Sequence, residues 1–307
     1  MSYTTNIKNE IVNLEYPKAE TISELSAIIN INSIIEKDSF SIYTENIGLS
    51  RRIYKLIKDL YNVEATIKKE KINRLNKKYI IHLTVNQNVD KILKDLSIID
   101  ENSKRLFKPK DYICEIEEEK KAYLRGSFLI SGSINDPKTS RYHLELIIQN
   151  KETASFINKL LNEMNFNSKI LKRDKNYMVY LKESEKISDF IKLLNAYNSL
   201  FYYEDIRIYR DHKNMTNRLN NCEQANIDKI VFSSNEQLEN IEILKKTYDF
   251  DLLDDKIKEI CIYKEKYPES SMQELANIMS IETNKKITKS GVNHRFRKIK
   301  EMIKKEN

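Results

Sequence analysis

The last residues of the chain, from Lys285 to Asn307, concentrate its positive charge. They hold nine lysines and arginines against two glutamates, so their surplus equals the net charge of +7 for all 307 residues. Arg and Lys side chains can hydrogen-bond guanine edges or phosphates, and Asn can pair with adenine through two hydrogen bonds. The residue types at this end therefore fit the recognition of DNA.

An apolar stripe in the same segment predicts which side chains point outward. Val292, Phe296, Ile299 and Ile303 recur at helical spacing, which predicts a helix that begins near residues 288–290. The first turns of such a helix are expected at base edges or the adjacent phosphates, and the later turns at phosphates or solvent. The first group comprises Lys289, Ser290, Asn293, His294 and Arg295, and the second comprises Arg297, Lys298 and Lys300.

Two further helices are predicted before this basic one, over residues 252–267 and from residue 270 onward. Ser270 or Ser271 can serve as N-cap of the second, with Glu274 close to capping-box spacing. Three short helices of which the third is basic are typical of a helix-turn-helix DNA reader. A solvated basic face on a terminal helix is the alternative interpretation.

The first two-thirds of the chain predict an order of elements that occurs twice. The first copy has a helix at 21–35, a strand at 40–46, a helix at 50–61, strands at 63–72 and 78–85 joined by a polar turn at 73–77, and a helix at 89–99. The second copy has a helix at 122–134, a strand at 143–150, a helix at 151–164, strands at 167–174 and 177–183, and a helix at 184–197. Leu25 and Leu124 mark equivalent places. We therefore expect an α+β fold of two pseudo-symmetric units.

The expected organisation has four parts. Residues 1–112 hold an N-terminal extension and the first repeat, and residues 113–212 hold the second repeat. A linker helix region follows at 213–250, and an all-α helix-turn-helix domain occupies 251–307.

Half of the four glycines in the chain lie in the first helix of the second repeat, at Gly126 and Gly132. A glycine inside a helix costs about 1 kcal/mol relative to alanine, so close helix packing must compensate. We expect the first helices of the two repeats to pack against each other, with Ala27 and Ser33 opposite the glycines.

The paired, glycine-bearing helices resemble the LAGLIDADG homing-endonuclease fold. Leu124, Gly126 and Gly132 match its motif, and Ser131 stands where the motif has its metal-binding acid. In the first repeat Asn32 stands at that position. Metal-dependent cleavage needs anionic oxygen ligands, so the resemblance predicts neither catalytic residues nor a bound metal. Asp136, just beyond the helix, is expected in a turn.

From end to end the chain resembles the WhiA family of bacterial transcription regulators. The matching stretches are AYLRGSFLISGSINDP, YHLEL, YLKESEKISDF, NRLNNCEQANIDK and SGVNHRFRK, in this order. The resemblance implies a catalytically inactive homing-endonuclease-like domain joined to a helix-turn-helix. It also implies roles in cell division and chromosome segregation, in sporulation in some relatives, and double-stranded DNA and a protein as partners.

A second basic surface is predicted on the two strand hairpins and the linker. Its residues are Lys69, Lys71, Lys169, Lys172, Arg173, Arg218 and Lys229. Phosphate contact and contact with a partner protein are equally compatible with these residues.

Other classes of chemistry lack a pattern in this sequence. The cysteines, Cys114, Cys222 and Cys261, have no metal-binding spacing, and neither a Gly-rich phosphate loop nor a Ser/His/Asp arrangement occurs, so no cofactor is expected. No apolar run approaches the roughly 20 residues of a membrane span. We expect a cytoplasmic, nucleoid-associated protein. A regulator is favoured over a DNA-bound division scaffold, and both over an active endonuclease.

Overall fold

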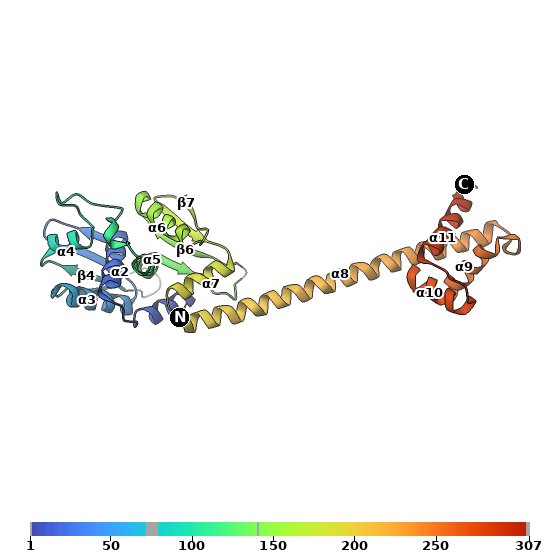
Figure 1. The fold of residues 1–307 in the computed structure, drawn as a ribbon, viewed down its shortest axis with the longest axis horizontal. Helices are drawn as coiled ribbons and strands as arrows, with labels where there is room; N and C mark the ends of the chain where they lie inside the picture. The colour runs from blue at the N-terminus through green and yellow to red at the C-terminus, as the bar shows by residue number, and fades with distance from the viewer. Residues whose placement is uncertain (1, 72–78, 140, 305–307) are drawn as a thin grey trace. The chain divides into compact units, whose positions relative to one another are not determined.

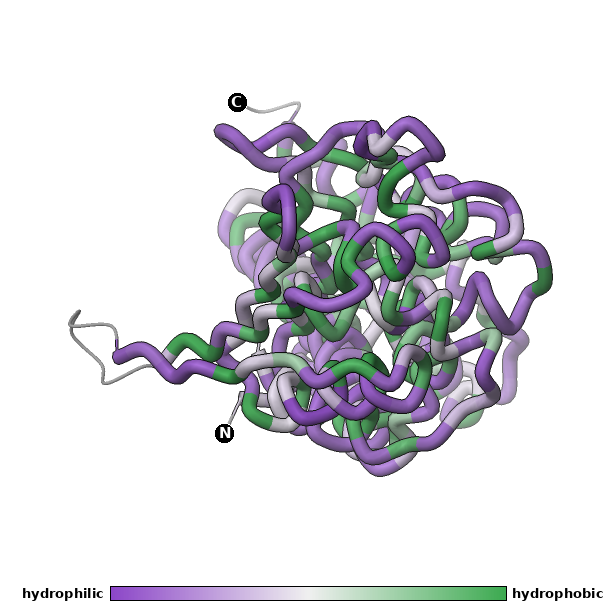
Figure 2. The backbone as a smooth tube through the Cα atoms, turned by 90° about the vertical axis from the view of Figure 1, so that its left-hand side faces the viewer, coloured by the Kyte–Doolittle hydropathy of each residue, from purple (hydrophilic) through white to green (hydrophobic). Residues whose placement is uncertain are grey.

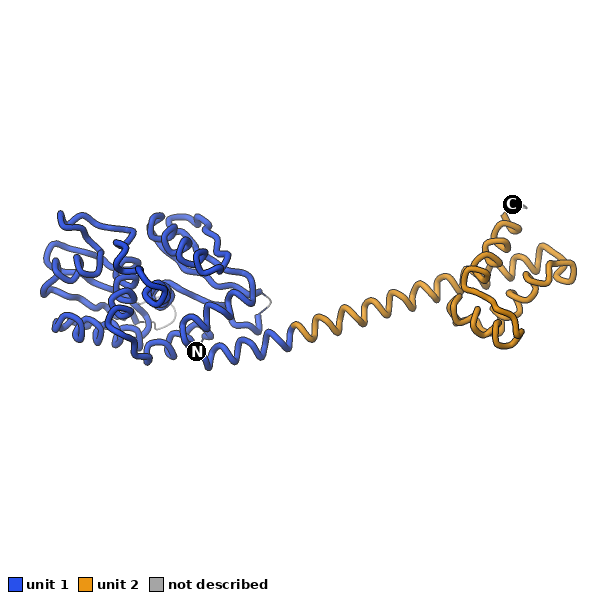
Figure 3. Tube along the Cα trace, in the orientation of Figure 1, with its two compact units in different colours: residues 1–210 blue, residues 211–307 orange. Residues whose placement is uncertain are grey.

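The computed structural model describes residues 2–71, 79–139 and 141–304. It divides into a first unit that ends at Arg210 and a second unit that begins at Asp211 (Figure 3). The polar turn expected at 73–77 lies outside the described residues. Figure 2 shows hydrophobic and hydrophilic residues alternating along the chain, as expected where each element buries one face.

The first unit repeats one order of elements, as the sequence predicted (Figure 1). The first repeat contains α2 (Lys18–Ile31), β1 (Ser33–Ile35), β2 (Phe40–Thr44), α3 (Ile47–Tyr61), β3 (Thr66–Lys71), β4 (Tyr79–Val85) and α4 (Val89–Asp95). The second contains α5 (Glu117–Ser131), β5 (Gly132–Ile134), β6 (Leu144–Ile148), α6 (Lys151–Glu163), β7 (Lys169–Arg173), β8 (Asn176–Leu181) and α7 (Ser184–Leu193). The short 3-10 helix η1 (Asp111–Ile113) lies between them. The expected duplicated α+β fold is confirmed.

Each repeat builds a four-stranded antiparallel sheet of the same topology. The strand orders are β1-β2-β4-β3 and β5-β6-β8-β7. β3 and β7 are therefore equivalent edge strands. Both strands are exposed along their whole length, whereas β4 and β8 each bury several residues in the core.

The sequence prediction missed β1 and β5, because it continued both first helices through these strands. α2 ends at Ile31, where Asn32 leaves the helical region at φ −140° and ψ 62°. α5 ends at Ser131, and Gly132 is extended at φ −86° and ψ 148°. Three-residue strands are too short to show the alternation that separates a strand from a buried helix.

Helices α2 and α5 pack against each other at the centre of the first unit. A Cβ atom on Gly126 would lie 2.3 Å from the carbonyl oxygen of Glu24 and 3.0 Å from Cβ of Ala27. Gly126 and Ala27 thus have the packing role that the sequence predicted. The same prediction was wrong for Gly132 and Ser33, which lie in β5 and β1. A Cβ on Gly132 would instead collide with Phe128 in the last turn of α5.

A buried ion-pair cluster joins the two repeats beside this contact. The carboxylate of Glu24, which is fully buried, accepts hydrogen bonds from Arg52 Nε at 2.5 Å and Arg125 Nε at 2.7 Å. The guanidinium carbon of Arg125 lies 3.4 Å from the centroid of the Tyr16 ring. Each buried charge has a partner, so the cluster fixes the pairing of the repeats without leaving an uncompensated ion.

The N-terminal helix α1 (Tyr3–Ile11) was not predicted, although Tyr3, Ile7 and Ile11 recur at i, i+4 and i+8 and are buried. α1 docks on the start of α8 (Tyr197–Thr247), where the carboxylate of Glu10 accepts hydrogen bonds from the amides of Asn198 and Ser199 at 2.8 and 3.1 Å. A carboxylate is favourable there, because the first amides of a helix lack intrahelical partners.

The second unit is helical. The rest of α8 is followed by η2 (Phe250–Leu252), α9 (Asp255–Lys266), α10 (Met272–Thr283) and α11 (Lys289–Lys304). A single apolar cluster holds these helices together and includes Ile241 and Leu244 from the end of α8.

Candidate nucleic-acid interface

The starts of α10 and α11 are fixed by capping hydrogen bonds. α10 begins with a capping box, in which the Glu274 amide donates to Ser271 Oγ at 3.3 Å and the Ser271 amide donates to Glu274 Oε2 at 2.8 Å. α10 ends at Asn284, which takes the left-handed conformation with φ 51°. The Gly291 amide then donates to Thr288 Oγ1 at 3.2 Å and closes the first turn of α11. These caps fix the turn between the two helices.

The apolar stripe of α11 is buried as predicted. Val292, Phe296, Ile299 and Ile303 face Leu275, Ala276 and Met279 of α10 and Ile257 and Ile260 of α9 within one cluster. The other side of α11 therefore faces solvent. Of the predicted DNA-contacting residues, the exposed ones are Lys289, Ser290, Asn293, His294, Arg297, Lys298 and Lys300.

Arg295 differs from the other predicted residues of α11. Its side chain is only 15% exposed, and Nη1 lies 2.7 Å from Glu259 Oε2 on α9. This ion pair ties α11 to α9. Arg295 therefore has a structural partner that its position off the apolar stripe did not predict.

The later turns of α11 pair with acids on neighbouring elements. Lys298 Nζ lies 3.1 Å from Asp254 Oδ2, and Lys300 forms an ion pair with Glu236. The pKa of Asp254 is lowered first by the hydrogen bond from the Lys256 amide and then by Lys298. The cationic side chains of these turns are thus partly neutralised by the protein itself.

The first turns of α11 are different. Across the described part of the chain, the side chains of Lys289, Ser290 and Asn293 have neither an ion pair nor a hydrogen bond, and all three are exposed. They carry the donors and acceptors that base edges and phosphates require. This face is the part of the second unit best suited to a DNA groove.

The second predicted surface lies partly on the edge strands. Lys69 and Lys71 project from β3, and Lys169, Lys172 and Arg173 project from β7. Nζ of Lys69 lies 4.1 Å from the Tyr79 ring centroid, a cation–π distance. None of these five cations pairs with an acid within the described ranges. Arg218 and Lys229 are exposed on α8, within the second unit.

Comparison with known proteins matches three consecutive segments to one family. Residues 18–99 match the WhiA N-terminal LAGLIDADG-like domain, residues 120–213 the WhiA LAGLIDADG-like domain, and residues 216–303 the WhiA C-terminal HTH domain. The protein called "Probable cell division protein WhiA" of Exiguobacterium sibiricum is 40% identical over 97% of this chain and 95% of its own length. The protein of the same name from Bacillus mycoides is 39% identical over 99% of this chain and 97% of its own.

The chain belongs to the WhiA family. The crystal structure of full-length DUF199/WhiA from Thermatoga maritima has the same fold, with a TM-score of 0.60 at 23% identity over 99% of both chains. The family assignment from sequence motifs and the combination of LAGLIDADG-like repeats with a helix-turn-helix are both confirmed.

In this WhiA-family chain the two motif positions that could hold acids carry neutral side chains engaged with the backbone. Asn32 Nδ2 donates to the Tyr43 carbonyl at 2.7 Å, and Ser131 Oγ donates to the Ser127 carbonyl at 2.8 Å. Asp136 accepts from the Lys138 amide at 2.9 Å in the expected turn. Among the described residues, no group of three or more His, Cys, Asp or Glu side chains is arranged to hold a metal ion.

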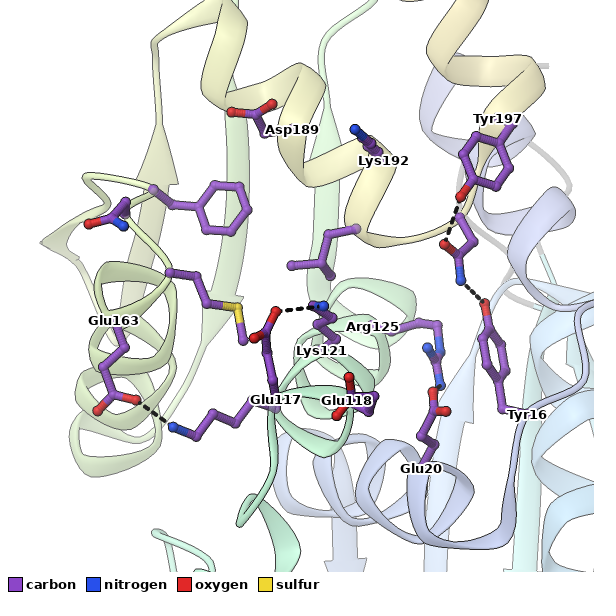
Figure 4. Close-up of a pocket in the computed structure, with 16 residues that line it drawn as sticks. Tyr16, Glu20, Glu117, Glu118, Lys121, Arg125, Glu163, Asp189, Lys192 and Tyr197 are labelled. Carbon is purple, nitrogen blue, oxygen red and sulfur yellow. Dashed lines mark hydrogen bonds and ion pairs between the residues drawn. The ribbon is translucent and has the colours of Figure 1, made fainter.

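A large polar pocket of about 880 Å³ opens at the start of α2 and α5 (Figure 4). Most charged side chains of the pocket form ion pairs with one another. The nitrogen–oxygen distances are 2.6 Å for Lys121 Nζ to Glu117 Oε1, 3.0 Å for Lys120 Nζ to Glu163 Oε2, and 3.4 Å for Arg125 Nη2 to Glu20 Oε2. The sequence does not predict this pocket. Its paired charges favour a structural, solvated cleft over a binding site.

No helix among the described residues is long and apolar enough to cross a membrane.

Proposed function

We propose that this protein is a sequence-specific, non-enzymatic DNA-binding transcription regulator that acts in cell division and chromosome segregation. Its relatives from Exiguobacterium sibiricum and Bacillus mycoides are each called "Probable cell division protein WhiA". In this proposal α11 enters the major groove, and the protein acts in the cytoplasm at the nucleoid.

The observation that carries the proposal is the free polar face at the start of α11. Lys289, Ser290 and Asn293 are exposed, and their side chains have no partner among the residues that the structure describes, while α11 is held by its apolar stripe and by Arg295. A reading helix needs a rigid scaffold and free side chains in its first turns. Asn293 can read adenine, and Lys289 can reach guanine or a phosphate.

The non-enzymatic part of the proposal rests on Asn32 and Ser131. Neither side chain is anionic, and each donates a hydrogen bond to a carbonyl oxygen of the same repeat. A divalent metal at this place would lack the carboxylates that hold it in phosphodiester hydrolysis. The LAGLIDADG-like repeats then supply a scaffold with the cationic strands β3 and β7, for DNA or for a protein partner.

The first experiment compares binding with regulation. We expect genome-wide occupancy mapping to give one recurring sequence, and depletion of the protein to change transcripts beside the occupied sites. Occupancy without transcript changes would support the alternative, a DNA-associated division and segregation scaffold without promoter control.

A point variant tests the recognition face directly. Asn293→Ala should reduce the preference for the selected site over unrelated DNA by about tenfold, because a bidentate base contact is worth about 1–3 kcal/mol. The matched control is Asn6→Ala, which also removes an exposed helical asparagine, on α1. Equal site preference in both variants would refute the assignment of α11 as the reading helix.

A further inference from the structure

The second unit contains a small cavity whose lining is cationic. It has a volume of about 260 Å³ and is bounded by α8, by the connection between α9 and α10, and by the starts of α10 and α11. Lys229, Lys264 and Lys289 line it, and no acidic residue does among the residues that the structure describes. A water molecule takes about 30 Å³ of liquid, so the cavity has room for a small hydrated anion.

Lys264 is the unusual member of this set. The residue is 1% exposed, and its ammonium donates to the Ser270 carbonyl at 2.9 Å. Within the described residues no carboxylate pairs with it, although an ammonium carries three donors. Burial lowers the pKa of Lys264, because desolvation disfavours the charged ammonium. A buried, unpaired charge is costly unless an opposite charge joins it.

Several other residues around the cavity are polar. Ser233 and Ser271 line it with hydroxyl groups, whereas the hydroxyl of Ser270 donates to the Tyr267 carbonyl at 2.7 Å. Met272 and Gln273, in the first turn of α10, also line it, and helix geometry leaves their amides without intrahelical acceptors. The cavity thus combines three lysines, one of them buried, with hydroxyl groups and the N-terminus of a helix. These are the groups that bind phosphate in proteins.

We propose that this cavity binds a phosphate group. Resting on the proposed function, the first source is a DNA backbone phosphate beside the groove that α11 enters, because Lys289 belongs both to the cavity and to the first turn of α11. Lys229 would then give α8 a direct part in holding DNA. The second source is a free phosphate-bearing small molecule, which binds through the same groups.

The DNA arm of the test uses the full-length protein and a duplex without the selected site. Lys264→Met keeps the side-chain length and removes the charge. We expect about tenfold weaker binding at low salt, and a slope of log affinity against log salt that is smaller by about one, as for one lost phosphate contact. The control is Lys256→Met, which removes an exposed lysine from the same helix, α9, outside the cavity. Its salt slope should match wild type.

A second variant keeps the test valid if Lys264→Met folds poorly. Lys229 is exposed, so Lys229→Gln leaves the core intact and should weaken DNA binding about threefold, with the same sense of change in the salt slope. Melting of Lys264→Met without phosphate provides the structural control. An apolar replacement of a buried unpaired charge should leave the melting temperature equal or higher.

The free-ligand arm replaces DNA by inorganic phosphate. Phosphate should raise the melting temperature of wild type above that in chloride of equal ionic strength, and Lys264→Met should lose this difference. A DNA effect supports the backbone source, whereas a phosphate effect with unchanged DNA binding supports a small-molecule source. No effect in either arm overturns the proposal. Sequence preference is tested with Asn293→Ala. A failure of the proposed regulator function would therefore appear in that variant and not in the two phosphate tests.

Discussion

Nη1 of Arg295 lies 2.7 Å from Oε2 of Glu259, and this ion pair fastens the basic helix α11 to α9. Both side chains are largely buried, at 15% and 23% exposed. The pair lets the free residues at the start of α11 keep a fixed direction, because the helix cannot rotate without breaking it. The position of Arg295 off the apolar stripe predicts only a place at base edges or the adjacent phosphates.

Arg295→Ala should therefore lower stability as well as DNA binding. We expect a loss of about 1–2 kcal/mol in the free energy of unfolding of the second unit, since Glu259 loses its partner in a partly buried place. Chemical denaturation of the single variants and of Arg295→Ala/Glu259→Gln measures the coupling. Strictly additive effects would show that the pair does not stabilise the unit.

The sequence predicted the second unit closely, because its signals are local. The capping box at Ser271 and Glu274 and the stripe from Val292 to Ile303 each lie within one helix. The sequence could not predict the partner of Arg295, because Glu259 is 36 residues away along the chain and only the packing of three helices brings the two together. The cavity around Lys264 was missed for the same reason.

In the first unit the sequence predicted the repeat, but it did not predict where the central helices α2 and α5 end. Ser131 was placed at the acid position by the resemblance to the motif and Asn32 by alignment of the first repeat with the second, and their hydrogen bonds to carbonyl groups appear only in the structure. A glycine at position 132 does not by itself predict where α5 ends, because glycine occurs both at close helix contacts and at helix ends. The close approach of Gly126 to the Glu24 carbonyl oxygen joins two helices that are far apart in the sequence, so only the structure gives its distance.

Gly126→Ala tests the close approach of α2 and α5. The added Cβ would lie 2.3 Å from the Glu24 carbonyl oxygen, so the helices must separate, and we expect a loss of about 1–3 kcal/mol in stability. Gly291→Ala is the matched control, because its Cβ would lie 3.6 Å from Thr288 Oγ1 in ordinary contact. That change should be neutral or stabilising by up to about 1 kcal/mol. Thermal denaturation of both variants decides, and similar losses would contradict the packing argument.

Acid should weaken the second unit through Asp254. The hydrogen bond from the Lys256 amide and the Lys298 ammonium lower its folded-state pKa. The unfolded chain then binds the proton more readily, so the stabilisation is present above the unfolded pKa of about 3.9 and is lost as pH falls through the lower folded value. Melting temperatures between pH 6 and pH 2.5 should fall less steeply for Asp254→Asn than for wild type. Parallel curves would show that Asp254 does not contribute.

The edge strands give a prediction about the second basic surface. Replacing Lys69, Lys71, Lys169 and Lys172 by Gln removes four exposed charges without touching the core. We expect weaker binding to unrelated DNA and a smaller salt slope, since each lost phosphate contact lowers the slope by about one. Unchanged DNA binding would assign β3 and β7 to a protein partner, which affinity capture with the wild-type and the substituted protein would then compare.

Cleavage is the sharpest test of the motif positions. Supercoiled plasmid incubated with the protein and Mg²⁺ or Mn²⁺ should stay uncut, because Asn32 and Ser131 supply no anionic oxygen for a metal. Asp136 lies in the turn after β5, where its carboxylate accepts a backbone hydrogen bond from Lys138, and it is the nearest acid along the chain to Ser131. The Asp136→Asn variant is therefore the control for any residual activity. Metal-dependent turnover by wild type that disappears in Asp136→Asn would show that the repeats have kept nuclease chemistry with a displaced ligand, and the regulator proposal would need a second activity.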